Sequence, residues 1–145
     1  MAGVEHLIET NETTISADCI RDVCGDLRAL GMKATDRDEW LLGFCIRRVD
    51  EQIRNACNLD AVPEGLRMCA AGLILAEFLT EKRSMGDLDE TALAIEPLLK
   101  QLAEGDTNIV YATDKMTSQD QLFDKLLSLL RDRKQQFVRY RRLTW

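Results

Sequence analysis

The chain has 145 residues, of which 46% are hydrophobic and 30% are charged. These values are typical of one folded globular domain, and they exclude a collagen-like or wholly disordered chain. No apolar run approaches the roughly 20 residues that cross a bilayer. The acidic start of the chain does not fit a secretory signal, so we expect a protein with no membrane partner.

The net charge of −6 is distributed unevenly. Residues 131–145 contain six basic side chains and one acid, a charge of +5, so the other residues together carry −11. An acidic body argues against a protein that coats nucleic acid with its whole surface. The basic end fits a protein that stays near nucleic acid without sticking to it, or one whose end binds an acidic partner.

All five cysteines lie in apolar patterns: Cys19, Cys24, Cys45, Cys57 and Cys69. Their odd number and the lack of a Cys-x-x-Cys pair favour buried thiols in a reducing compartment over disulfides or a zinc site. A catalytic thiol needs a base, and the only histidine, His6, lies in the polar N-terminal segment. No nucleotide-binding glycine motif occurs, so we predict no catalytic, metal or cofactor site.

Two helices are predicted in the first part of the chain. Residues 1–15 are expected to form a loose leader, after which Ser16 or Ala17 begins a helix that ends at Gly31. Thr35 is placed to cap a second helix. The apolar stripe predicted for this second helix repeats at three- and four-residue steps: Trp40, Leu41, Phe44, Cys45, Val49, Ile53 and Cys57.

A third helix follows a short turn. Pro63 suits the first helical position, where its missing N–H has no partner to lose. The sequence from Leu66 to Leu79 is apolar almost all round. A helix without a polar face is a buried helix, so we predict that this one forms the centre of the core.

The segment 84–116 separates the third helix from the last one. Gly105 and Asp106 lie between apolar, partly β-branched runs, which predicts a hairpin with strands near 98–104 and 107–112. A long excursion of this kind is usually functional or mobile.

The last helix is predicted to begin at a cap formed by Thr117 or Ser118 and to carry an apolar face that extends to Phe137. The predicted fold class is therefore mainly α. It is a small bundle of about four helices around a buried central helix, formed by residues 16–138, with the hairpin excursion before the last helix.

The chain ends in a basic, aromatic tail over residues 139–145. Five of its side chains are arginine, tyrosine or tryptophan, the types enriched in interface hot spots: Arg139, Tyr140, Arg141, Arg142 and Trp145. We predict that this tail docks on a partner and that deletion of residues 137–145 leaves the fold intact. The alternative is a solvated helix end whose cations interact with the helix dipole.

Three segments carry a family resemblance: CNLDAVPEGL at 57–66, EGDTNI at 104–109 and RYRRLTW at 139–145. In this order they resemble the head–tail connectors of tailed phages and prophages, also called head-completion adaptors. The segment 57–66 resembles the turn that leads into the buried helix of that family. The segment 104–109 is similar to its EGDTS-type segment, with Asn108 where Ser or Thr is commoner, and 139–145 is similar to its basic, aromatic chain end.

The resemblance implies a structural protein, not an enzyme, that forms a ring of about twelve copies under the portal protein. Such a ring extends the DNA channel and offers a platform to a stopper or tail-completion protein, and duplex DNA passes through it without specific binding. The implied location is the head–tail interface of the virion, and the host cytoplasm before assembly. Gly105, Asp106 and Thr107, with the tail residues, are the expected portal or subunit contacts.

Two further interpretations stay open. A cytoplasmic helical protein-interaction module would use the same core and tail. A nucleic-acid binder would use the C-terminal arginines, but the charge of −11 on the rest of the chain disfavours it. An enzyme is the weakest interpretation.

Overall fold

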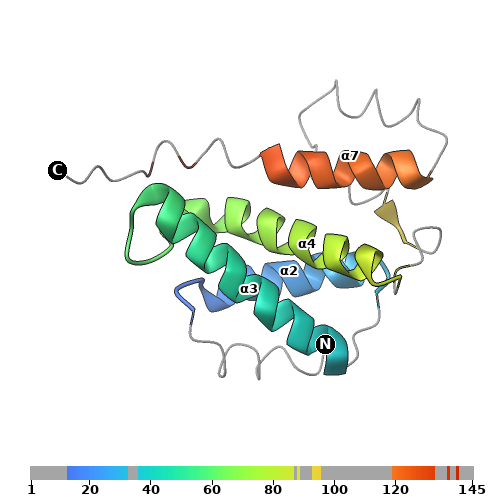
Figure 1. The fold of residues 1–145 in the computed structure, drawn as a ribbon, viewed down its shortest axis with the longest axis horizontal. Coiled ribbons are helices and arrows are strands. Elements are labelled where there is room, and N and C mark those ends of the chain that lie inside the picture. The colour runs from blue at the N-terminus through green and yellow to red at the C-terminus, as the bar shows by residue number, and fades with distance from the viewer. Residues whose placement is uncertain are drawn as a thin grey trace.

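The computed structural model describes residues 13–32, 36–86, 88, 93–95, 119–132, 137 and 140. This part of the chain contains four α-helices and one 3₁₀ turn, in the order α2 (Ala17–Ala29), α3 (Asp36–Cys57), η1 (Glu64–Leu66), α4 (Arg67–Ser84) and α7 (Gln119–Asp132). The prediction of a mainly helical fold is confirmed (Figure 1). The predicted hairpin at 98–104 and 107–112 lies outside the described residues.

Helix α4 lies at the centre of the bundle, as its apolar sequence predicts. Helices α2 and α3 pack along one side of it, and α7 packs on the other (Figure 1). Its residues 69–76 are buried without interruption. Ala70, Ala71 and Gly72 present almost no side-chain bulk, which permits close approach of a neighbouring helix.

The two outer helices that follow the simple apolar pattern bury the faces that the sequence predicts. The core residues of α2 are Cys19, Ile20, Val23, Cys24 and Leu27. Those of α7 are Leu122, Phe123, Leu126, Leu127 and Leu130. Both helices are amphipathic at the helical repeat, so burial of the apolar face against α4 removes it from water.

The packed region begins before the first helix, at residues that the sequence places in the leader. Ile15 is buried in the core. The Thr14 hydroxyl donates a hydrogen bond to the carboxylate of Asp50 on α3 and accepts one from the Val62 N–H at 2.9 Å. Residues 13–15 therefore join α3 to the turn that precedes α4, and residues 1–12 lie outside the described part.

The predicted start and end of α2 are confirmed. The Ser16 side chain accepts a hydrogen bond from the Cys19 N–H at 3.2 Å, which caps the helix. Gly31 has φ +85°, and its N–H and that of Met32 donate to carbonyls of the last turn at 2.9 and 3.1 Å. This is the Schellman arrangement, which requires a left-handed residue after the helix.

The predicted position of Pro63 is wrong by one turn. Pro63 does not begin the α-helix, because its backbone is extended and precedes the 3₁₀ turn η1. The Leu66 N–H donates to the Pro63 carbonyl at 3.0 Å, which closes a tight turn and carries Leu66 into the core. Helix α4 then begins at Arg67.

A buried ion pair joins the start of α3 to the end of α4. The Lys82 Nζ donates to the Asp38 Oδ1 at 2.6 Å, and both side chains are buried. A buried charge without a partner is strongly unfavourable. The pair therefore holds α3 in the rotation that turns Asp38 toward α4.

That rotation corrects the core stripe predicted for α3. The buried apolar residues are Leu42, Cys45, Ile46, Val49, Ile53 and Cys57. Trp40 is 72% exposed and Phe44 is 41% exposed, so neither belongs to the core. Asp38 and Leu42 share one helix face, and Trp40 and Phe44 lie on the face opposite to it.

We expect opposite effects from alanine at two glycines, one inside α2 and one just after it. Gly31→Ala should lower the free energy of unfolding by about 1–2 kcal/mol, because a side chain disfavours the left-handed backbone. Gly25→Ala, in the helix interior, should raise it by about 0.5–1 kcal/mol. A Cβ atom at either position meets no atom within 4 Å, so packing does not enter. Urea denaturation measures both, and equal effects would contradict the assignment of the helix end.

Removal of one member of the buried pair should destabilise the fold strongly. We expect Lys82→Ala to cost about 3–5 kcal/mol, because Asp38 stays buried without its partner. Asp124→Ala, which breaks the exposed 3.0 Å pair with Arg83, should cost less than about 1 kcal/mol. Thermal denaturation followed by circular dichroism compares the two, and a similar loss for both would show that Lys82 and Asp38 do not act as a buried pair.

Candidate interaction surface

The sequence-predicted contact residues fall almost entirely outside the described part. Among these residues the structure describes only Tyr140. The residues that lie outside the described part are Gly105, Asp106, Thr107, Arg139, Arg141, Arg142 and Trp145. The portal or subunit contacts expected of these other residues therefore stay a prediction.

Tyr140 packs against its own domain. Its side chain is half-buried against the hydrophobic core. It lies so close to Gly65 of η1 that a Cβ atom at Gly65 would overlap the tyrosine hydroxyl. Glycine is therefore required at position 65 for the ring to lie there. Two of the family-like segments, 57–66 and 139–145, meet at this contact.

Phe137 adds a second contact between the C-terminal segment and the same turn. Its side chain is half-buried against the core, and its carbonyl accepts a hydrogen bond from the Cys57 thiol at 3.6 Å. Residues 137 and 140 thus lie against the end of α3 and the start of α4. The residues 137–145 that we predict to be dispensable for the fold therefore include two that pack on it.

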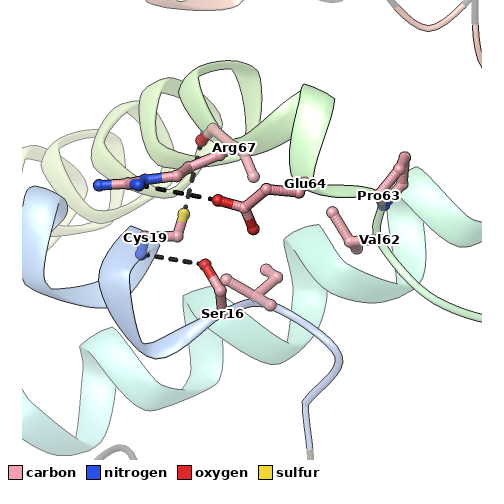
Figure 2. Close-up of a pocket in the computed structure, with 8 residues that line it drawn as sticks. Ser16, Cys19, Val62, Pro63, Glu64 and Arg67 are labelled. Atoms are coloured by element: carbon pink, nitrogen blue, oxygen red, sulfur yellow. Dashed lines mark hydrogen bonds and ion pairs between the residues drawn. The ribbon is translucent and has the colours of Figure 1, made fainter.

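A shallow depression lies beside η1, between the start of α2 and the start of α4 (Figure 2). The Arg67 guanidinium lies at its edge and joins α2 to η1. It contacts the Asp22 carboxylate at 2.7 and 2.8 Å and forms an ion pair with Glu64 at 3.7 Å. The free space is about 10 Å³, room for a single water molecule. The depression is therefore too small to hold a substrate.

The cysteine in this depression is a poor nucleophile. Burial raises the pKa of the Cys19 thiol to about 12, and the nearby Asp22 carboxylate adds to the rise. The thiol donates to the Arg67 carbonyl at 3.5 Å (Figure 2). Burial likewise raises the pKa of the Cys45 thiol to about 12. All five cysteines are buried and none of them forms a disulfide, as their apolar sequence setting predicts.

The most exposed aromatic residue in the described part lies on the outer face of α3. The rings of Trp40 and Phe44 stack with centroids 6.5 Å apart and planes at 9°, and the Arg48 guanidinium lies 5.8 Å from the Phe44 centroid. These three residues, spaced by four along the helix, are called the aromatic stripe below. Tryptophan and arginine are the residue types that dominate protein interfaces.

The charges beside the aromatic stripe are mixed. Arg37, Arg47 and Glu51 are exposed on the same outer face of α3. Arg48 also reaches Glu77 and Glu81 of α4 at 3.5 and 3.6 Å, which fixes the edge of the stripe against the central helix. A stacked, exposed pair of aromatic rings beside arginines has the residue types of a protein docking surface.

Trp40 and Phe44 are predicted in the core because they have the same four-residue spacing as true core positions. The sequence also contains a signal that these two residues are exposed. Leu42 and Ile46 continue a purely aliphatic stripe through Val49, while Arg47 and Arg48 lie beside the aromatic residues. Two apolar stripes on one helix indicate that one of them faces away from the core.

No family model, no curated protein and no solved structure matches this chain. Within the described ranges, no group of three or more His, Cys, Asp or Glu side chains is arranged to hold a metal ion. None of the described helices has the length and apolar character that a bilayer crossing requires.

We expect Gly65→Ala to displace Tyr140, since the new methyl group takes the place of its hydroxyl. In the full-length chain this change should lower the melting temperature about as much as Tyr140→Ala does. In the Tyr140→Ala background it should have almost no further effect, because the contact is already lost. A double-mutant cycle by thermal denaturation measures the coupling, and additive effects would show that the two residues do not touch.

Proposed function

We propose that this protein is a head–tail connector subunit of a tailed phage or prophage. In this role it forms a ring beneath the portal, extends the DNA channel and offers a platform to a stopper or tail-completion protein. It acts as a structural part of the virion and not as an enzyme, and it is free in the host cytoplasm before assembly. The hairpin over 98–112 supplies part of the contact with the portal or with a neighbouring subunit.

The contact between Tyr140 and Gly65 is the observation that best supports this proposal. It joins two of the three segments on which the family resemblance rests, although they are far apart in the sequence. The segment 57–66 leads from the end of α3 into the buried helix α4, which is the place that the resemblance gives it. With Tyr140 seated on that turn, the basic residues that follow start from a defined point on the domain.

Charge supports the same role. The chain outside residues 131–145 carries −11, and duplex DNA carries one negative charge per about 1.7 Å of its axis. An acidic wall repels the duplex, so DNA moves along it without being held. Arginines at the chain end, by contrast, form paired hydrogen bonds with carboxylates of a protein partner.

A truncation tests the proposal without disturbing the packed residues. Removal of residues 141–145 deletes Arg141, Arg142 and Trp145 but keeps Phe137 and Tyr140 on the core. We expect the truncated chain to keep its melting temperature and to fail to restore infectious particles to a phage that lacks this protein. An interface anchor of this kind typically contributes about 2 kcal/mol or more, and each subunit of a ring would lose it.

Leu143→Ala is the matched control, because it keeps both arginines and the tryptophan and should restore particles. Electron microscopy of the restored virions should show a ring of this chain beneath the portal. Virions without such a ring, or normal particles from the truncated chain, would contradict the proposed function. A virion that lacks the ring while the chain binds another cytoplasmic protein would favour the interaction-module interpretation.

A further inference from the structure

The turn between α3 and α4 is contacted by segments from both ends of the chain. On one side, the Thr14 hydroxyl accepts a hydrogen bond from the Val62 N–H at 2.9 Å. On the other side, the Tyr140 ring lies in the space that Gly65 leaves because it has no side chain. Gly65 follows Val62 by three positions, so both contacts fall on one short piece of backbone.

This piece of backbone has little freedom. The ring of Pro63 restricts its own φ, which is −69°. The Leu66 N–H donates to the Pro63 carbonyl at 3.0 Å, and the Leu66 side chain is buried in the core. A displacement of Val62 is therefore passed on to Gly65, because the residues between them cannot absorb it.

The Thr14 contact is fixed by a buried carboxylate. Asp50 of α3 is 2% exposed, and it accepts hydrogen bonds from the Thr14 hydroxyl and, at 3.4 Å, from the Thr14 N–H. The Arg54 Nε lies 3.4 Å from the same carboxylate. A buried carboxylate is unfavourable without such partners. Thr14 is therefore held on α3, and the hydroxyl that binds Asp50 also sets the position of Val62.

The contact on the other side of the turn is of a weaker kind. Phe137 and Tyr140, together called the strap below, are half-buried against the core. The Phe137 carbonyl accepts a hydrogen bond from the buried Cys57 thiol at 3.6 Å, and a thiol is a weak donor. Segments with few buried contacts open at a lower free energy than packed core helices do. Opening of the strap would remove the Phe137 carbonyl from Cys57 while the helices stay packed.

We infer that the strap opens and closes over this turn, and that its closure is coupled to the contact between Thr14 and Val62. The Tyr140 ring needs Gly65 at one position, since a displacement of about 0.5–1 Å removes a quarter to a half of a van der Waals contact. Thr14 sets that position from the opposite side. Whatever orders the chain around Thr14 therefore favours the closed strap, and the closed strap stabilises the Thr14 contact by the same factor. The coupling is a property of the isolated chain and does not depend on the proposed function.

Alkylation of Cys57 in the native full-length protein measures opening of the strap. The probe is N-ethylmaleimide, and mass spectrometry of peptides gives the rate for each cysteine separately. Cys24 and Cys45 are buried on α2 and α3 and report opening of the core. We expect Tyr140→Ala to accelerate alkylation of Cys57 by about 10-fold or more, and that of Cys24 and Cys45 by less than about twofold.

Two substitutions of Thr14 test the coupling. Thr14→Val removes the hydroxyl with little change of shape, and it should accelerate alkylation of Cys57 about fivefold, a size typical of residues in one contact network. Thr14→Ser is the matched control: it keeps the hydroxyl and should stay within about twofold of the unchanged chain. In the Tyr140→Ala background, Thr14→Val should add less than about twofold, because the strap is already open. Circular dichroism shows whether each variant remains folded.

The reciprocal measurement needs no change at Thr14. Tyr140→Ala should accelerate hydrogen exchange of the Val62 N–H about fivefold, the factor expected for Thr14→Val at Cys57. Nuclear magnetic resonance follows this amide. Gly31→Ala, beyond the far end of α2, is the control for a general loss of stability. It should leave the rates at Val62 and Cys57 within about twofold, since both report local opening.

Three results would overturn the inference. Equal acceleration of Cys57 and the core cysteines by Tyr140→Ala would show that the strap does not open separately from the core. A full fivefold effect of Thr14→Val in the Tyr140→Ala background would show that the two contacts are independent. Unchanged exchange of the Val62 N–H in Tyr140→Ala would show that the turn transmits nothing. A virion without a ring of this chain would reject only the connector role.

Discussion

The burial of residues 69–76 of α4 among the other helices is the constraint on which the rest of this structure depends. A helix with no polar face is stable in water only when other elements surround it, so α2, α3 and α7 each place one apolar face against it. The small side chains of Ala70, Ala71 and Gly72 let a neighbour approach closely. Lys82 lies on the same helix and is buried with it, and its ammonium group forms an ion pair with Asp38 of α3. That pair sets the rotation of α3, and the rotation exposes Trp40 and Phe44.

The turn between α3 and α4 is where distant parts of the chain converge. Thr14 reaches it from the N-terminal side through Val62 and Asp50. Tyr140 reaches it from the C-terminal side through Gly65. The position of the turn is thus determined by contacts from both sides as well as by the helices that it connects.

Local patterns predict the helices well because their signals are local. Ser16 caps α2 through a bond to a residue three positions away, and Gly31 ends it through its own backbone conformation. The buried character of α4 follows from its composition alone. The helix start predicted at Pro63 is one turn too early, because a proline suits both the first helical position and the extended residue before a 3₁₀ turn. The bond from the Leu66 N–H to the Pro63 carbonyl decides between them.

The candidate surface is much less predictable. The residue type of Tyr140 is enough to select it as a candidate contact residue. Its contact with Gly65, however, depends on how two segments 75 residues apart meet in space. The sequence by itself determined which segments are helical, which helix is central and that the thiols are buried, because these follow from side-chain polarity at helical spacing. Only the tertiary structure decided which of two apolar stripes on α3 faces inward. The physical reason is that a buried lysine on another helix requires Asp38 as its partner, and helical periodicity carries no information about that partner.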